Sequence, residues 1–434
     1  MRSRFLDSCQ RFRHNGCGYR AEWEFMFKYS MICLVTGFFL ACDTGDKTPS
    51  HTTKQWGTIA GDTVNAIAID VEDNIYFTGH TRGSLDGNNT SAGSSDVFLV
   101  KWSADGTSAW IRQWGSPAWD EGRSVAIDPD GNVLVTGFTE GSLDGNVSVG
   151  GRDVFLAKWS SDGTKIWSQQ WGTEGLDIGA AVTTDEDGNI FVAGHTNGAF
   201  GMDDNEAGYD IFLCKRDADG TRIWLEQWGT QKDKFATSIT VDRQGGVIVG
   251  GYGGREHYDD IEDSLLIKWK TNGYQSWVQR TGTFSGRTDS ITIDTTGHII
   301  VVGRESLLSQ KVFLARVWNY DGTTDWEKKL ISSGSAEGYG VAVDVAGDIY
   351  IVGATTGSFE GTKSAGELDA FIAKFHLDGT QVWIRQWGTP QDDMASSIAL
   401  SSRGVIYAAG NTSGSFGENV GSGGDDIFFT EWQP

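Results

Sequence analysis

Cysteine and proline are both scarce in this sequence, with 5 of each among 434 residues. Cys9, Cys17 and Cys33 lie in an N-terminal segment that we expect to be removed, so only Cys42 and Cys214 would remain. Two cysteines exclude the disulfide framework that holds many small exported domains together. Cys214 stands where equivalent segments place mostly small apolar residues, so we interpret it as a buried, unreactive thiol.

Basic charge and hydrolase motifs are also lacking. The chain has 35 Lys and Arg residues against 58 Asp and Glu residues, a formal net charge of -23. This balance argues against nucleic acid, or a membrane surface bound through basic contacts, as a partner. The sequence contains no H-E-x-x-H, no Cys/His cluster and no G-x-S-x-G. We therefore assign no catalytic residue, and a zinc site has no support.

The first 42 residues predict an export leader. Met26-Phe27-Lys28 and the run "MICLVTGFFLAC" (Met31–Cys42) are typical of a charged n-region and a short h-region, so Met26 is an alternative start to Met1. The apolar run is too short to span a bilayer. Its end, Phe39-Leu40-Ala41-Cys42, resembles a bacterial lipobox, which implies a lipid on Cys42. Phe39 and Leu40 depart from the usual pattern, and a plain secretory signal is the alternative.

These features predict a protein that is exported and is either lipid-anchored in the cell envelope or extracellular. Residues 43–52 are polar and form a tether in this interpretation. The lipid is the only contact with a membrane that we expect.

From Thr53 onward one supersecondary unit recurs seven times. Its third strand opens with an Asp and reads D-x-F-[LI] in most copies, and the fourth ends in Gln-Trp-Gly. The second copy shows the unit best, with predicted strands at 123–128, 133–139, 153–159 and 165–172 and an Asp-Gly-Asn hairpin turn at 130–132. The opening residues of the third strand are Asp96, Asp153, Asp210, Asp263, Lys311, Asp369 and Asp426.

Four short strands with apolar residues on both faces need neighbours on both sides. Phe155 and Ala157 lie on one face of the third strand, and Val154 and Leu156 lie on the other. Units of this length stacked face to face are the blades of a β-propeller. We predict an all-β fold: residues 53–434 form a single seven-bladed β-propeller of four-stranded antiparallel blades.

The two ends of this region each hold part of one unit. The segment "TKQWGT" (Thr53–Thr58) has no third strand before it, and "DIFFTEW" (Asp426–Trp432) has no Gln-Trp-Gly after it. We predict that the N-terminal segment is the fourth strand of the last blade, which would close the ring and remove an exposed sheet edge.

These segments, with D-x-x-G-N, D-x-F-[LV]-x-K and D-G-T-x-x-W patterns, resemble the bacterial seven-bladed β-propeller repeat (SBBP-type) family of exported lipoproteins. The resemblance covers Thr53 to Trp432 and implies the fold, but it implies no particular activity. The fourth and fifth copies depart most, because Arg280-Thr281-Gly282 and Lys329-Leu330-Ile331 replace Gln-Trp-Gly. We expect those two blades to pack less regularly.

Aromatic and histidine side chains give a weaker signal. The pairs Trp110/Trp114, Trp167/Trp171 and Trp383/Trp387 are four residues apart on a strand, so both members face one side. These pairs either form an aromatic platform that binds sugar or, as we favour, pack between neighbouring blades. His80 and His195 share a repeat position that other copies fill with different residues. No blade carries polar residues that the sequence marks as unique at the channel mouth.

Acidic residues supply the candidate metal site. The long loops between second and third strands share one face of the propeller with the connections between blades, so we expect a loop-rich acidic face there. Calcium prefers hard oxygen ligands. The candidate calcium ligands are Asp62, Asp120 and Asp177 on the connections, with Asp86 and Asp144 on the long loops. The alternative is that these carboxylates cap loop N–H groups.

We therefore predict a monomeric, non-catalytic scaffold that binds a protein or glycan partner through the loop-rich face. The alternative is a hydrolase or lyase with a site at the mouth of the central channel. A quasi-symmetric ring of carboxylates and glycines at that mouth would favour binding, and a non-repeating polar cluster would favour an enzyme.

Overall fold

The computed structural model divides the chain into two units, Met1–Thr48 and Pro49–Pro434. It describes residues 51–85, 87, 93–201, 208–254, 262–281, 286–307, 310–319, 321–417, 421 and 423–433. The predicted leader with Cys42, most of the tether and the candidate ligand Asp86 lie outside these residues. None of the described residues forms a helix that is long and apolar enough to cross a membrane.

The described residues form seven four-stranded antiparallel sheets, as predicted. Blades 1 to 3 consist of β2 (Asp62–Ile69), β3 (Ile75–Thr81), β4 (Asp96–Trp102) and β5 (Ser108–Trp114); β6 (Asp120–Ile127), β7 (Val133–Thr139), β8 (Asp153–Trp159) and β9 (Lys165–Trp171); and β10 (Asp177–Thr184), β11 (Ile190–Thr196), β12 (Asp210–Arg216) and β13 (Arg222–Trp228).

Blades 4 to 6 consist of β14 (Lys234–Val241), β15 (Val247–Gly254), β16 (Glu262–Trp269) and β17 (Gln275–Thr281); β18 (Gly286–Ile293), β19 (Ile299–Leu307), β20 (Gln310–Trp318) and β21 (Thr324–Leu330); and β22 (Ala336–Val343), β23 (Ile349–Thr355), β24 (Asp369–Phe375) and β25 (Gln381–Trp387). Blade 7 consists of β26 (Asp393–Leu400), β27 (Ile406–Thr412), β28 (Asp426–Trp432) and β1 (His51–Trp56).

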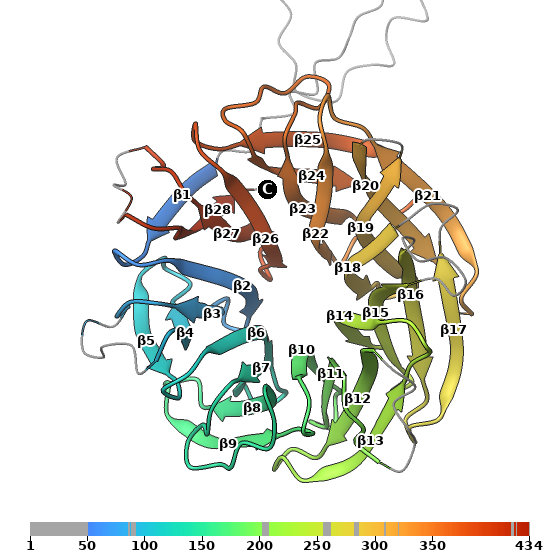
Figure 1. Ribbon diagram of the computed structural model, residues 1–434. Coiled ribbons are helices and arrows are strands. Elements are labelled where there is room, and N and C mark those ends of the chain that lie inside the picture. Colours follow the sequence, from blue (N-terminus) through green and yellow to red (C-terminus); the bar gives the residue numbers. More distant parts are fainter. Residues whose placement is uncertain are drawn as a thin grey trace, which may run out of the picture. The chain divides into compact units, whose positions relative to one another are not determined.

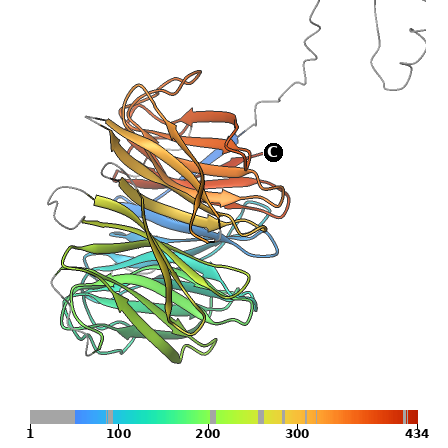
Figure 2. The ribbon, with the colours of Figure 1, turned by 90° about the vertical axis from the view of Figure 1, so that its right-hand side faces the viewer.

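The seven sheets are arranged in a ring, with the first strand of each blade at the centre (Figure 1). Figure 2 shows the same ring from the side. Consecutive strands belong to one blade or to neighbouring blades, so the loops that connect them lie at the two ends of the strands. The first strand of each blade begins at the end that carries the long loops, for example Asp62 opposite Thr81 in blade 1.

The hairpin turn between the first two strands of a blade is built by one aspartate. Asp128 Oδ1 accepts hydrogen bonds from the backbone N–H groups of Asp130, at 3.0 Å, and Asn132, at 2.8 Å. Gly131 between them has a φ of 80°, in the left-handed region that glycine adopts without strain. The Asp-Gly-Asn pattern is thus a turn and not the start of a calcium loop.

The core lies between neighbouring blades. Val97 and Leu99 of blade 1 pack against Val135 and Ala157 of blade 2, and similar clusters join the other blades. Trp114 belongs to the same cluster, with its ring 4.9 Å from that of Trp159. Tryptophan packing between blades is therefore confirmed, because the large ring fills the gap that widens toward the rim.

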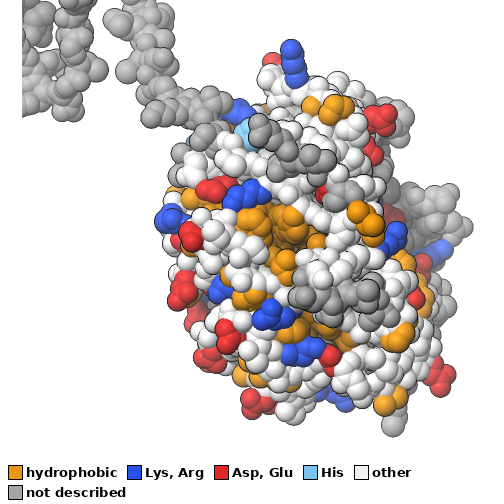
Figure 3. All heavy atoms as spheres, turned by 90° about the vertical axis from the view of Figure 1, so that its left-hand side faces the viewer, with side chains coloured by type: hydrophobic (Ala, Val, Ile, Leu, Met, Phe, Trp, Pro, Cys, Tyr) orange, Lys and Arg blue, Asp and Glu red, His pale blue; other side chains and the backbone are white. Residues whose placement is uncertain are grey.

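Cationic side chains cover several of these rings at the rim. Lys54 Nζ lies 4.6 Å from the centre of the Trp102 ring, and Lys165 Nζ lies 4.9 Å from that of Trp159. Figure 3 shows the rim on the side of β1 and β5, where basic side chains stand beside apolar ones. Such cation–π contacts use the tryptophan faces that an exposed sugar platform would need.

The glutamine of the Gln-Trp-Gly motif holds the long loop of its own blade through hydrogen bonds. Gln170 Nε2 donates to the Gly141 carbonyl at 2.9 Å and to Asp153 Oδ2 at 2.7 Å, and its Oε1 accepts from Leu143 N at 2.9 Å. A Cβ on Gly172 would lie 2.8 Å from Asp177 Oδ2, so only glycine fits beside these carboxylates. Equivalent bonds to an aspartate and a loop carbonyl are made by Gln55, Gln113, Gln227 and Gln386.

The N-terminal strand closes the ring, as predicted. β1 pairs with β28 in antiparallel register from His51 opposite Trp432 to Trp56 opposite Ile427 (Figure 1). Gln55 then donates to Gly414 O and Asp426 Oδ2, both at 2.8 Å, as the fourth-strand glutamine does in other blades. β1 begins two residues before Thr53, where we placed the first predicted strand residue.

The fifth copy differs from the prediction by one residue. We placed Lys311 at the position of Asp96, but the strand register assigns that position to Val312, which pairs with Glu305 as Asp96 pairs with Thr81. β19 ends at Leu307 and β20 begins at Gln310, so no long loop precedes this third strand to mark its first residue in the sequence. Blades 4 and 5 nevertheless keep four paired strands each, and their less regular packing stays a prediction.

We expect that removing β1 destabilises the protein. A chain that begins at Gly57 lacks the fourth strand of blade 7 and the Trp56 ring, which lies between Phe77, Trp102 and Phe429. Its melting temperature should fall by about 10 °C or more relative to a chain that begins at His51. Calorimetry of the two chains measures the difference. Equal melting temperatures would contradict closure by β1.

Candidate functional site at the channel mouth

The innermost strand of every blade carries a β-bulge near its loop-side end. In β2 the pairing with β3 skips one residue between Val64 and Ala66, so Asn65 has no partner in the ladder. A bulge redirects the side chain of the extra residue, here toward the central channel. The seven bulged residues are Asn65, Arg123, Ala180, Thr237, Asp289, Tyr339 and Ser396.

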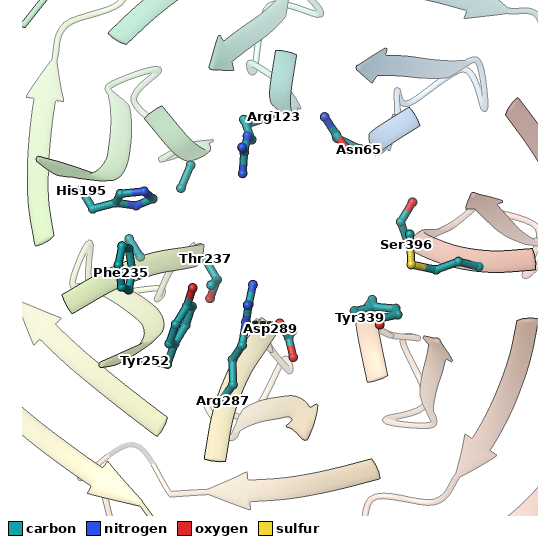
Figure 4. A pocket seen from close by; sticks show the side chains of 13 residues that line it. Asn65, Arg123, His195, Phe235, Thr237, Tyr252, Arg287, Asp289, Tyr339 and Ser396 are labelled. Atoms are coloured by element: carbon teal, nitrogen blue, oxygen red, sulfur yellow. Dashed lines mark ion pairs between the residues drawn. The ribbon is translucent and has the colours of Figure 1, made fainter. Parts of the chain in front are cut away.

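All seven bulged residues line one cavity of about 400 Å³. It lies at the mouth of the channel on the loop-rich face, since each bulge follows closely on the first residue of its strand. Figure 4 shows these side chains converging from different blades. Two further repeat positions contribute to the wall: the second residue of the first strand gives Phe235, Arg287 and Met394, and the end of the second strand gives His195 and Tyr252.

Two arginines stand on opposite parts of this wall, each paired with a buried carboxylate. Arg123 Nε lies 2.8 Å from Glu121 Oε1, and Arg287 Nε lies 2.6 Å from Asp289 Oδ1. The arginine side chains are 38% and 30% exposed, whereas both carboxylates are under 10% exposed. Since each contact uses Nε, the terminal amino groups of both guanidinium groups can serve a ligand.

A third ion pair borders the site. Arg304 pairs with Glu337, and the Tyr339 hydroxyl donates to Glu337 Oε2 at 3.0 Å. Burial, followed by the charge of Glu337, raises the pKa of Tyr339, so its hydroxyl stays protonated. Burial raises the pKa of Asp289 to about 6, although Arg287 and Arg304 act in the opposite direction.

His195 lines the cavity as a neutral imidazole. Its side chain is almost wholly buried, and burial together with the charges of Arg123 and Arg287 lowers its pKa to about 3. The ring packs edge-on against Phe235 with 5.1 Å between ring centres. Nδ1 is buried without a hydrogen-bond partner among the described residues. The imidazole is one of the polar groups that line the cavity.

The hydroxyl side chains at the mouth are already engaged. Thr237 Oγ1 donates to the carbonyls of Gly250 or Thr288, at 3.1 and 2.9 Å, and Ser396 Oγ lies 3.1 Å from Val64 O. The bonds from Thr237 to Thr288 and from Ser396 to Val64 join neighbouring blades. Neither hydroxyl is therefore held by a base in the way that an activated nucleophile is.

The four described members of the predicted calcium set, Asp62, Asp120, Asp144 and Asp177, do not form a metal-binding group. Asp62, Asp120 and Asp177 begin the first strands of three blades, are fully buried, and cap the turns before them. Asp120 Oδ2, for example, accepts from Ser116 N at 2.5 Å and from Ser116 Oγ at 3.0 Å. Asp144 is exposed, 2.7 Å from Lys165 Nζ, and Asp86 lies outside the described residues. Nowhere in the described ranges do three His, Cys, Asp or Glu side chains form a group that could hold a metal.

The sequence analysis missed the channel residues. It found no blade with unique polar residues at the mouth, yet Arg287, Asp289 and Tyr339 are unique to blades 5 and 6. Motif searching selects positions that repeat, and these positions vary. Reading the seven copies as columns would have shown them: the bulge column holds seven different residue types between repeating neighbours.

The fold and this site define a seven-bladed β-propeller with a polar channel mouth. The model of one family, the β-propeller repeat SBBP, matches residues 109–144 and 166–201. Each match runs from the fourth strand of one blade into the second strand of the next. The repeat of the family model therefore begins with a fourth strand, just as β1 is a fourth strand that precedes blade 1. These two segments of the chain are therefore similar to the SBBP β-propeller repeat.

Two curated relatives are much longer than this chain. An uncharacterized WD repeat-containing protein, L264, of Acanthamoeba polyphaga mimivirus is 28% identical over 142 residues, 29% of this chain and 10% of that protein. The regulatory protein FlaEY of Caulobacter vibrioides is 23% identical over 331 residues, 73% of this chain and 32% of that protein.

Among solved structures, the β-propeller domain of the Trilobed protease from Pyrococcus furiosus has a TM-score of 0.46 and 8% identity. The similarity covers 88% of this chain and 94% of that one.

The raised pKa of Asp289 predicts a pH-dependent contribution to stability. The folded protein binds this proton more tightly than the unfolded chain, so the contribution is complete below about pH 4 and is lost as the pH rises through about 6. Asp289→Asn does not titrate. From pH 4 to pH 7 the free energy of unfolding of the wild type should therefore fall by about 3 kcal/mol relative to that of Asp289→Asn. Urea titrations at both pH values measure this, and a constant difference would contradict it.

Proposed function

We propose that this protein is a binding propeller whose ligand site is the channel mouth on the loop-rich face. The observation that carries the proposal is the pair Arg123 and Arg287, whose partly exposed guanidinium groups border a cavity of about 400 Å³. Cavities of this size that combine aromatic walls with a few placed polar groups are the usual form of small-ligand sites.

The ligand carries a negative charge in this proposal. Two guanidinium forks that face one cavity match carboxylate or phosphate oxygens, with which arginine forms strong bidentate hydrogen bonds. The formal net charge of the chain is -23, so arginines at the mouth supply local positive charge on an acidic protein.

Catalysis is the second candidate, and one observation favours it. The mouth is a non-repeating polar cluster, not a symmetric ring of carboxylates, and buried Asp289 has a pKa near neutrality. Against it stand Thr237 and Ser396, whose hydroxyls are bonded to backbone carbonyls. Binding therefore accounts for the geometry with fewer assumptions than a hydrolase or lyase does.

We test the binding proposal with Arg287→Gln and a matched arginine elsewhere. Arg222, exposed at the start of β13 on the outer edge of blade 3, supplies the control Arg222→Gln. Calorimetric titration with a panel of small carboxylates and phosphate should find at least one ligand. Its affinity should fall about tenfold or more in Arg287→Gln and stay unchanged in the control. Equal affinities in both variants would place binding elsewhere.

Export and lipid anchoring belong to the same proposal. They are supported by the apolar run at Met31–Cys42, by Ala41 before the cysteine and by the polar residues after it. A tethered propeller would present the channel mouth outside the cytoplasm. Calcium binding by the loop-face aspartates stays a prediction without support from the described residues.

A labelled fatty acid tests the anchor. Cells that produce the full chain should incorporate the label into the wild-type protein and not into Cys42→Ser. The variant Cys214→Ser, which removes the buried cysteine of β12, should be labelled like the wild type. Label retained in Cys42→Ser would contradict lipidation at this residue.

A further inference from the structure

The wall beside Arg287 carries both hydrogen-bonding groups and aromatic rings. His195 and Phe235 line the same cavity as Tyr252, and the rings of Phe235 and Tyr252 are stacked with 5.1 Å between centres. Arg287 lies over the outer face of this pair, 4.2 Å from the Tyr252 ring centre. A ligand held by Arg287 therefore lies next to an aromatic surface.

The imidazole of His195 specifies the kind of polar group that fits. A neutral histidine has one donor and one acceptor nitrogen, and the Tyr252 hydroxyl both donates and accepts. A hydroxyl on the ligand complements either tautomer of His195, since it too donates and accepts. A second anionic group there is excluded, because the neutral imidazole provides no charge to balance it.

The ion pairs at the mouth favour a ligand with a single negative charge over one with several. Arg123, Arg287 and Arg304 are each paired with a carboxylate, so the cluster carries little excess positive charge. A planar carboxylate also matches the flat guanidinium fork. A doubly charged phosphate would be less well balanced in a cavity bordered by Glu121, Asp289 and Glu337.

We propose that the channel mouth binds a hydroxylated monocarboxylate of sugar size, a uronic acid, with its carboxylate at Arg287 and a hydroxyl at His195. This inference rests on the proposed function, and it adds the chemical class of the ligand. The rings of Phe235 and Tyr252 supply the apolar part of the cavity wall beside these polar groups.

The test separates the two halves of the ligand. Calorimetric titrations of the whole protein use D-glucuronate and D-galacturonate, with glucose, acetate and inorganic phosphate as fragments that each lack one feature. At least one uronate should bind about tenfold or more tightly than every fragment. His195→Phe should weaken the uronate by about tenfold and leave acetate unchanged, whereas Arg287→Gln should weaken both.

The variants are chosen from residues that the repeat already tolerates. Blade 2 has Phe138 and blade 7 has Asn411 where blade 3 has His195, so His195→Phe and His195→Asn suit the fold. His376→Phe, at a half-exposed side chain in the connection between β24 and β25, is the control and should not alter binding. His195→Asn, which keeps a donor and an acceptor, should retain more affinity than His195→Phe.

Two results would overturn the inference in different ways. If acetate or phosphate binds as tightly as the uronates, and His195→Phe has no effect, the mouth is a general anion site and the proposed function still stands. If no uronate, acetate or phosphate binds to the folded protein, the inference fails together with the proposed anion site.

Discussion

Five of the seven blades, including the one that closes the ring, depend on hydrogen bonds between the fourth-strand glutamine and the aspartate that opens the third strand. Gln170 joins Asp153 to the Gly141 carbonyl, and Gly172 lets Asp153 and Asp177 approach the same backbone. One motif thereby fixes the long loop and the entry into the next blade. Gln55 of the N-terminal strand makes the same bonds to Gly414 and Asp426, which lie 359 and 371 positions further along the chain. These bonds therefore help to close the ring.

The candidate site follows from a second repeated feature, the bulge in each innermost strand. The bulge turns one side chain per blade toward the channel, and the repeat itself does not restrict which side chain this is. Blades 4 to 6 also lack the turn aspartate, because Lys234, Gly286 and Ala336 stand where Asp62, Asp120, Asp177 and Asp393 begin other blades. The same blades supply most of the aromatic and charged wall.

The blades and the closure of the ring by β1 could be predicted from the sequence, because Asp-Gly turns, D-x-F-[LI] strands and Gln-Trp-Gly recur in it. The register of β20 was misplaced by one residue, since its short hairpin offers no such landmark. The channel residues could not be found by the same reasoning: Arg123, Arg287 and His195 differ from the residues at equivalent positions in most blades. Their convergence depends on bulges and on ring closure, which are properties of the assembled fold.

The central claim is that repeated residues hold the ring and variable residues at the mouth bind the ligand. The combined variant Arg123→Ala, Arg287→Ile and His195→Phe tests it, because blade 3 has Ala180 and Ile178 and blade 2 has Phe138 at these positions. We predict that the variant still unfolds in one cooperative transition, at a melting temperature lowered by the unpaired carboxylates of Glu121 and Asp289, with binding of small carboxylates abolished. Retained binding, or loss of the cooperative unfolding transition, would contradict the account.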